Sequence, residues 1–76
     1  MQIILEQWMR FNPIEDGSNK ITLVEETFRT AEGSEGFRYY IDADFEIGTK
    51  MAFSLEQANN IVMRLKGGDI WVRVLS

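Results

Sequence analysis

The chain has 76 residues and a formal net charge of −4, the balance of 12 acidic and 8 basic side chains. It contains no cysteine and no histidine, which excludes disulfides and thiolate metal ligands and removes the usual general base of enzymes. The negative charge disfavours contact with a phosphate backbone, and no segment resembles a membrane span or a signal peptide, so we expect a cytoplasmic protein without nucleic-acid or membrane contact.

The first segment, residues 2–11, has an ambiguous pattern. Its apolar side chains fit one face of a helix and also one face of a strand. No residue before Ile3 can cap a helix, and a long strand further along the chain needs long partners. We therefore favour a strand here and leave the helix open. Residues 12–19 are expected to be a loop, because their proline, aspartate and glycine favour turns.

Two longer strands are expected next. Residues 20–30 are rich in β-branched side chains. Residues 37–47 alternate between apolar and polar side chains, which predicts a strand with one buried and one exposed face. Residues 32–36 between them have the composition of a hairpin loop, so the two strands should pair antiparallel. Gly48 ends the alternation, and residues 50–53 fit a short further strand.

The clearest helix signal begins at Ser54. Ser54 and Gln57 have the spacing of a capping box, in which each side chain satisfies a free amide of the first turn. The apolar residues that follow fall within one arc of a helical wheel; they are Leu55, Ala58, Ile61, Val62 and Leu65. Gly67 favours a left-handed C-cap after Lys66. Met63 lies in the polar arc, and we interpret it as incidentally exposed.

The last segment, residues 70–75, predicts a terminal strand with Ile70, Val72 and Val74 on one face. The predicted fold class is therefore α+β: one domain spanning residues 1–76, with an antiparallel sheet of four to five strands. One amphipathic helix, at about residues 54–66, packs on one face of this sheet in the order β-β-β-(β)-α-β.

The face of the sheet opposite the helix is the first candidate site. If the helix covers the face that carries Ile41 and Val72, large aromatic and basic side chains remain on the other face. If residues 2–11 form a strand, Ile4 lies on this face with Trp8. The strand at 20–30 offers Ile21 and Leu23 to one face and Val24 and Phe28 to the other. The candidate partner-binding residues are Trp8, Tyr40, Trp71, Arg38 and Arg73. Such residue types are enriched at interface hot spots, so we expect a homodimer face or a site for a different protein. The alternative is a second small core, made by sheet curvature or by a loop folding over with Ile14.

The second candidate site is an acidic strand face formed by Asp42, Asp44 and Glu46. Neighbours on one face of a strand lie about 7 Å apart, too far for this row to surround a cation without other segments. A solvated strand face explains the row, and we expect no metal, no cofactor and no catalytic residue. With Glu25 or Glu26 beside it, the row is also compatible with mimicry of nucleic acid. As an enzyme, the chain has only carboxylate pairs such as Asp42 and Asp44 for acid–base work.

No motif in the sequence identifies a family. In size, acidity and lack of catalytic residues, the chain resembles the compact acidic proteins that phages encode as stoichiometric inhibitors of host machinery. We therefore interpret it as a small, non-enzymatic protein-binding module, an inhibitor or regulator that acts on a protein partner or on itself as a homodimer. The alternative is a nucleic-acid-mimicking inhibitor of a DNA- or RNA-binding protein, acting through the acidic strand face.

Overall fold

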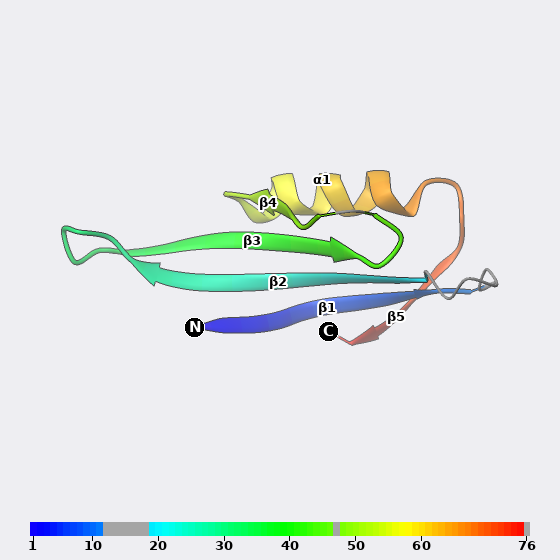
Figure 1. Cartoon of the computed structure of the whole chain (residues 1–76), viewed down its shortest axis with the longest axis horizontal. Helices are drawn as coiled ribbons and strands as arrows, with labels where there is room; N and C mark the ends of the chain where they lie inside the picture. Colours follow the sequence, from blue (N-terminus) through cyan, green and yellow to red (C-terminus); the bar gives the residue numbers. More distant parts are fainter. Residues whose placement is uncertain (12–18, 47, 76) are drawn as a thin grey trace.

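The computed structural model describes residues 1–11, 19–46 and 48–75. Its elements are β1 (Gln2–Arg10), β2 (Lys20–Arg29), β3 (Glu35–Ala43), β4 (Lys50–Ala52), α1 (Leu55–Lys66) and β5 (Trp71–Leu75). The strands form one antiparallel sheet in the order β4-β3-β2-β1-β5, with α1 on one side (Figure 1). The α+β prediction is confirmed, including a strand for the N-terminal segment. The loop predicted at residues 12–19 lies outside the described residues except for Asn19. The alternative in which this loop folds over the aromatic side chains with Ile14 therefore also lies outside them.

The hairpin of β2 and β3 forms the centre of the sheet. Its strands pair in register from Ile21 opposite Ala43 to Arg29 opposite Glu35. The loop closes where the Thr30 amide donates to the Ser34 carbonyl at 2.8 Å. Gly33 supplies the positive φ of +87° that this tight turn needs. The predicted hairpin is therefore confirmed.

A β-bulge in β1 sets which of its side chains face the helix. Ile4 lies opposite Val24, but Glu6 lies opposite Leu23, so Leu5 is an extra residue at this point. An extra residue changes the face on which the following side chains point. Trp8 is consequently on the helix side and only 6% exposed. In a strand without a bulge, Trp8 would share a face with Ile4, four residues earlier, and the prediction had placed both away from the helix.

One side of helix α1 packs against the core. Ser54 caps it by accepting a hydrogen bond from the Gln57 amide at 3.1 Å. The Gln57 side chain accepts in return from the Phe53 amide, one residue before the position expected in a capping box. Gly67 ends the helix at φ +60°. Leu55 was predicted to be buried but is 45% exposed, because the buried contacts of α1 begin one turn later at Ala58.

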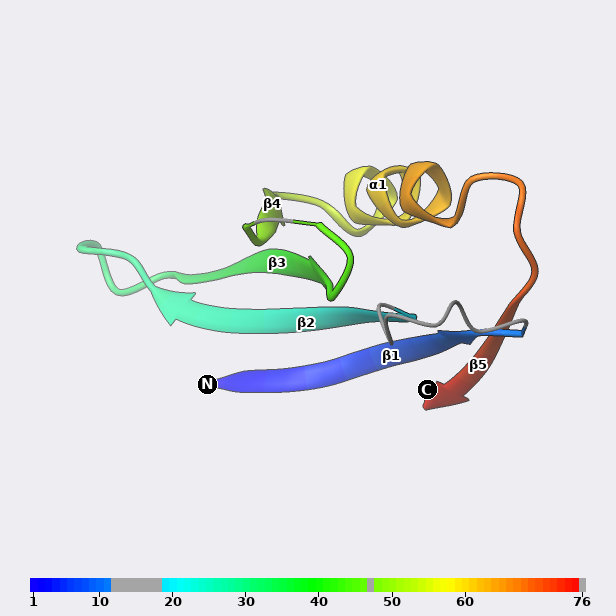
Figure 2. The same cartoon turned by 45° about the vertical axis from the view of Figure 1, so that its right-hand side comes forward.

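The core lies between α1 and the sheet. Its buried members are Trp8, Ile21, Leu23, Ile41, Ala43, Ala52, Ala58, Ile61 and Val62. The small residues Ala52 and Ala58 let α1 approach β4 closely. Figure 2 shows α1 beside β4 and above β3, while the tip of the β2–β3 hairpin extends past both. Side chains near that end, including Phe37 at 48% exposure, therefore stay partly in solvent.

Strand β3 ends at Ala43, four residues earlier than the alternating pattern predicted. The Glu46 amide donates to the Ala43 carbonyl at 3.0 Å, which closes a turn. Phe45 then packs against Trp71, with 5.7 Å between ring centroids. The alternation continues in the sequence because this turn also needs an apolar residue at Phe45, so the pattern alone does not show where the strand stops.

Strand β5 presents the opposite face from the one predicted. Trp71 pairs with Arg10 and Val72 pairs with Met9, which places Trp71 on the helix side and Val72 away from it. The Trp71 indole donates to the Lys66 carbonyl at 3.0 Å. The Arg10 guanidinium lies 4.5 Å from the Trp71 ring centroid. The hydrogen bond satisfies the indole N–H of this partly buried tryptophan, and the guanidinium covers its ring.

Candidate functional site

The face of the sheet away from α1, here called the open face, carries a continuous row of apolar side chains. Ile4, Val24, Tyr40 and Met51 are successive Cα partners across β1, β2, β3 and β4. Ile4 is 50% exposed and Met51 is 45% exposed. No described helix or strand packs over this apolar row, because the buried side chains of α1 contact the opposite face of the sheet, which carries Ile21, Leu23 and Ile41.

One flank of the apolar row is a hydrogen-bonded group around the Glu26 carboxylate. Gln2 Nε2 donates to it at 2.8 Å, Arg38 Nε at 2.5 Å and the Tyr40 hydroxyl at 3.2 Å. The Gln2 hydrogen bond, followed by that of Arg38, lowers the pKa of Glu26 below its ordinary value. The Arg38 guanidinium also lies 4.4 Å from the Phe28 ring centroid. This flank is therefore ordered before any partner binds.

The other flank of the apolar row is polar as well. Gln7 Nε2 donates to Thr22 Oγ1 at 3.1 Å, and Asp42 is the next cross-strand neighbour of Thr22. Asp42 is exposed and forms no ion pair within the described part of the chain. A hollow of about 360 Å³ crosses the apolar row, lined by Gln2, Val24, Tyr40, Asp42 and Thr49. An apolar centre with polar flanks is the usual anatomy of a protein interface.

A second apolar pair extends the open face toward the other edge of the sheet. Met9 and Val72 are direct cross-strand partners on β1 and β5. They are 44% and 45% exposed, respectively. The open face therefore exposes apolar side chains from all five strands of the sheet.

The five predicted partner-binding residues do not share a face. Arg38 and Tyr40 lie on the open face, as expected. Trp8 and Trp71 pack on the helix side, where the Lys66 ammonium lies 4.4 Å from the Trp8 ring centroid. Arg73 pairs with Trp8 in the sheet and approaches Glu6 at 3.5 Å. The prediction of one shared surface is wrong, because it assumed no bulge in β1 and the opposite orientation of β5.

The sequence did not predict that Ile4, Val24, Tyr40 and Met51 form one row. Ile4 had been expected on this face, and Val24 had been assigned only to one face or the other. Met51 was not singled out, although its neighbour Ala52 gives a signal: a small residue packs inward beneath the helix and the large one points outward. Alignment of the row across four strands depends on the register of each pair, and no local pattern contains that information.

The predicted acidic strand face is not formed. Asp42 lies on the open face, but β3 ends before the other two acids. Asp44 Oδ1 accepts a hydrogen bond from the Lys20 amide at 2.9 Å. Glu46 lies beyond the turn, 3.7 Å from Lys50 Nζ. The three carboxylates thus occupy three different environments and present no row of charges to a partner.

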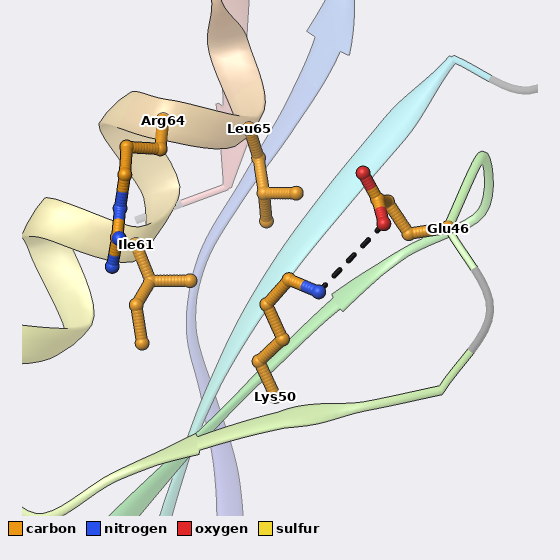
Figure 3. A pocket seen from close by; sticks show the side chains of 5 residues that line it. All are labelled: Glu46, Lys50, Ile61, Arg64 and Leu65. Carbon is orange, nitrogen blue, oxygen red and sulfur yellow. Dashed lines mark ion pairs between the residues drawn. The ribbon is translucent and has the colours of Figure 1, made fainter.

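A second hollow, of about 440 Å³, lies between α1 and the segment that follows β3 (Figure 3). Ile61 and Leu65 point toward it from the helix, and Lys50 and Glu46 meet at its opposite side. Arg64 extends along the helix, away from Glu46. Of the three charged residues that line the hollow, Glu46 and Lys50 neutralise one another and Arg64 does not converge with them, so this hollow lacks the convergent polar groups of a specific ligand site. The open face is the stronger candidate.

No three acidic side chains in the described ranges lie close enough together to hold a metal ion. Within the same residues, no helix is long and apolar enough to cross a membrane. Comparison of the chain with protein-family models, with curated proteins and with solved structures found no match.

Proposed function

We propose that the protein is a cytoplasmic, non-enzymatic protein-binding module that acts by covering a surface of a larger protein with its open face. In this role it is a stoichiometric inhibitor or regulator. The observation that carries the proposal is the apolar row of Ile4, Val24, Tyr40 and Met51, which crosses four strands without a covering element in the described chain.

The dimensions of the open face support this role. Strands lie about 4.8 Å apart and rise about 3.4 Å per residue, so the five strands, of 9, 10, 9, 3 and 5 residues, span on the order of 600 Å². A standard protein interface buries about 800 Å² on each partner. The open face therefore supplies most of the area that a specific complex needs. Its centre is apolar, and its flanks carry both signs of charge through Glu26, Arg38 and Asp42.

The positions of the acids favour this proposal over nucleic-acid mimicry. Asp44 and Glu46 are bonded to groups of their own chain, and Glu26 is neutralised by Arg38. A mimic needs several carboxylates in a regular and unpaired row. Asp42 alone on the open face does not provide one.

Two lysine substitutions of exposed methionines test the proposal. Met51→Lys places a charge in the apolar row, and Met63→Lys makes the same change on the outer side of α1, where the methionine is 68% exposed. The tagged chain and both variants are used for affinity capture from the lysate of the native source. A protein bound by the wild type should be retained by Met63→Lys and lost by Met51→Lys. Equal retention by both variants would contradict the proposal.

Salt dependence separates the two kinds of partner. Binding centred on Met51 and Tyr40 should change little between low and high ionic strength, because apolar contacts are not screened. A nucleic-acid mimic should lose affinity steeply over the same range. If affinity falls steeply with salt and Met51→Lys captures the partner as well as the wild type does, the protein is a mimic and the open face is excluded as the binding site.

A further inference from the structure

The N-terminal half of β1 is an uncovered sheet edge. Strand β1 pairs with β2 along nearly its whole length, from Gln2 to Met9. Strand β5 lies on its other side but pairs only with Gln7 to Arg10. Among the described residues, no strand lies beside Gln2–Glu6 on that side.

Two hydrogen bonds at the start of β1 fix which backbone groups point out of this edge. The Met1 nitrogen donates to the Thr27 carbonyl at 3.1 Å. The Thr27 amide donates to the Met1 carbonyl at 2.9 Å. Hydrogen-bonded and non-hydrogen-bonded pairs alternate along antiparallel strands, so Ile3 also faces β2. The N–H and C=O groups of Gln2 and Ile4 therefore point away from the sheet.

The bulge at Leu5 reverses this alternation, as the far end of β1 shows. There the Arg10 amide donates to the Asn19 carbonyl on the β2 side, and the Phe11 amide donates to the Ile70 carbonyl on the β5 side, both at 2.9 Å. Before the bulge, the N–H and C=O groups of even-numbered residues point away from β2; after it, those of odd-numbered residues do. The outward groups beyond the bulge face β5, whereas no strand in the described part of the chain receives those of Gln2 and Ile4.

The side chains of this edge do not prevent pairing with another strand. Natural edge strands are commonly protected by lysine, proline or a bulge within the exposed stretch. Residues 2–5 contain no charge and no proline. Ile3 is 47% exposed on the helix side and Ile4 is 50% exposed on the open face. The bulge lies at the end of this stretch, so four consecutive residues remain available.

We propose that this edge pairs antiparallel with the same edge of a second copy of the chain. The proposal is independent of the partner assigned to the open face. Outward groups must meet outward groups, so Gln2 pairs with Ile4 of the second copy and Ile3 faces Ile3 on the two-fold axis. Sliding the register toward Glu6 would bring Met1 against Gln7 of the second copy, where β5 already lies beside Gln7 through Leu75. The register centred on Ile3 is therefore the longest unobstructed one.

This pairing has a structural consequence for the open face. The two-fold axis runs perpendicular to the sheet, so both helices lie on one side and both open faces on the other. Two sheets of five strands become one continuous sheet. Because Gln2 faces Ile4 of the second copy, the two apolar rows then run end to end across the join, offset by two residues along β1, and offer a partner two equivalent sites.

A proline substitution tests the backbone contact. Gln2→Pro removes an N–H that points outward, which an edge strand tolerates, and leaves the apolar row unchanged. Gln2→Thr is the matched control, because it loses the same Glu26 contact but keeps the N–H. Sedimentation equilibrium should show a wild-type dimer that Gln2→Pro weakens about tenfold or more through two lost hydrogen bonds. Gln2→Thr should dimerise nearly as the wild type does; equal weakening by both variants would overturn the proposal.

A single cysteine tests the register without relying on affinity. The chain contains no cysteine, so each introduced thiol is unique. Facing residues of a non-hydrogen-bonded pair have Cα atoms about 4.5 Å apart, within the range of a disulfide. On mild oxidation Ile3→Cys should form a disulfide-linked dimer, and Met63→Cys and Met51→Cys should not. Preferential cross-linking of Met51→Cys would show face-to-face association and overturn the edge pairing, as would a wild type that stays monomeric up to about 1 mM.

The two proposals fail in different ways. Gln2→Pro should weaken dimerisation yet capture the open-face partner to the same extent as Gln2→Thr, because both variants lose the Gln2 side chain that borders the open face. Met51→Lys should abolish capture yet keep the dimer. Circular dichroism of Gln2→Pro checks that the fold is retained. Should that variant unfold, the Ile3→Cys cross-link still decides the edge pairing.

Discussion

Truncation of Ile61 tests how helix α1 holds the fold. Ile61 is 9% exposed and belongs to the core, and it also borders the hollow between α1 and the segment after β3. Ile61→Ala removes three carbons, which at about 0.8 kcal/mol each corresponds to about 2.4 kcal/mol of lost burial. The space left behind opens toward solvent, so the added cavity cost is small and the total should be about 2–3 kcal/mol.

That loss is large for a chain of this size. A domain of 76 residues has a free energy of unfolding of about 4–11 kcal/mol. Urea denaturation followed by circular dichroism should therefore show a clearly lower midpoint for Ile61→Ala with an unchanged slope. Met63→Ala, two positions further along the same helix and 68% exposed, should change stability by no more than about 0.5 kcal/mol. If the two variants are equally damaging, α1 is buried on both sides and the architecture described above is wrong.

Three other substitutions test particular contacts. Trp71→Phe removes the indole donor to the Lys66 carbonyl and should cost about 1–2 kcal/mol in urea denaturation. Gly36→Ala places a Cβ 2.6 Å from the Phe28 ring and should cost about 1 kcal/mol by the same assay, since the ring must move. The lowered pKa of Glu26 stabilises the fold above the ordinary glutamate pKa of about 4.3, and this contribution is lost as the pH falls through the lower folded-state pKa. Thermal unfolding of Glu26→Gln between neutral and acidic pH should therefore depend less on pH than that of the wild type.

The secondary structure could largely be predicted from the sequence, because each element has a strong local pattern. The β-branched run at residues 20–30 and the capping residues around α1 correspond closely to β2 and to Leu55–Lys66. The hairpin followed from the glycine-rich loop between two apolar runs. These features depend on interactions within a few residues, which a sequence pattern contains.

The candidate site could be predicted only in part, because it depends on which way each strand faces. A single extra residue at Leu5 moves Trp8 to the helix side. Trp71 and Val72 are both apolar, so either could have pointed inward; the choice is made by the Lys66 carbonyl and by Arg10, which is distant in the sequence. Tertiary register decides such cases, and periodicity cannot.

The methionines provide the most direct measurement of the central claim, that the open face is the binding surface. Met9 and Met51 lie on the open face, and Met63 lies on the outer side of α1, with exposed fractions of 44%, 45% and 68%. Oxidative footprinting of the free chain and of its captured complex, read by mass spectrometry, reports all three side chains at once. If the open face binds the partner, the complex protects Met51, and Met9 where the partner reaches β5, while Met63 is oxidised as in the free chain. Protection of Met63 with unchanged oxidation of Met51 would contradict this claim.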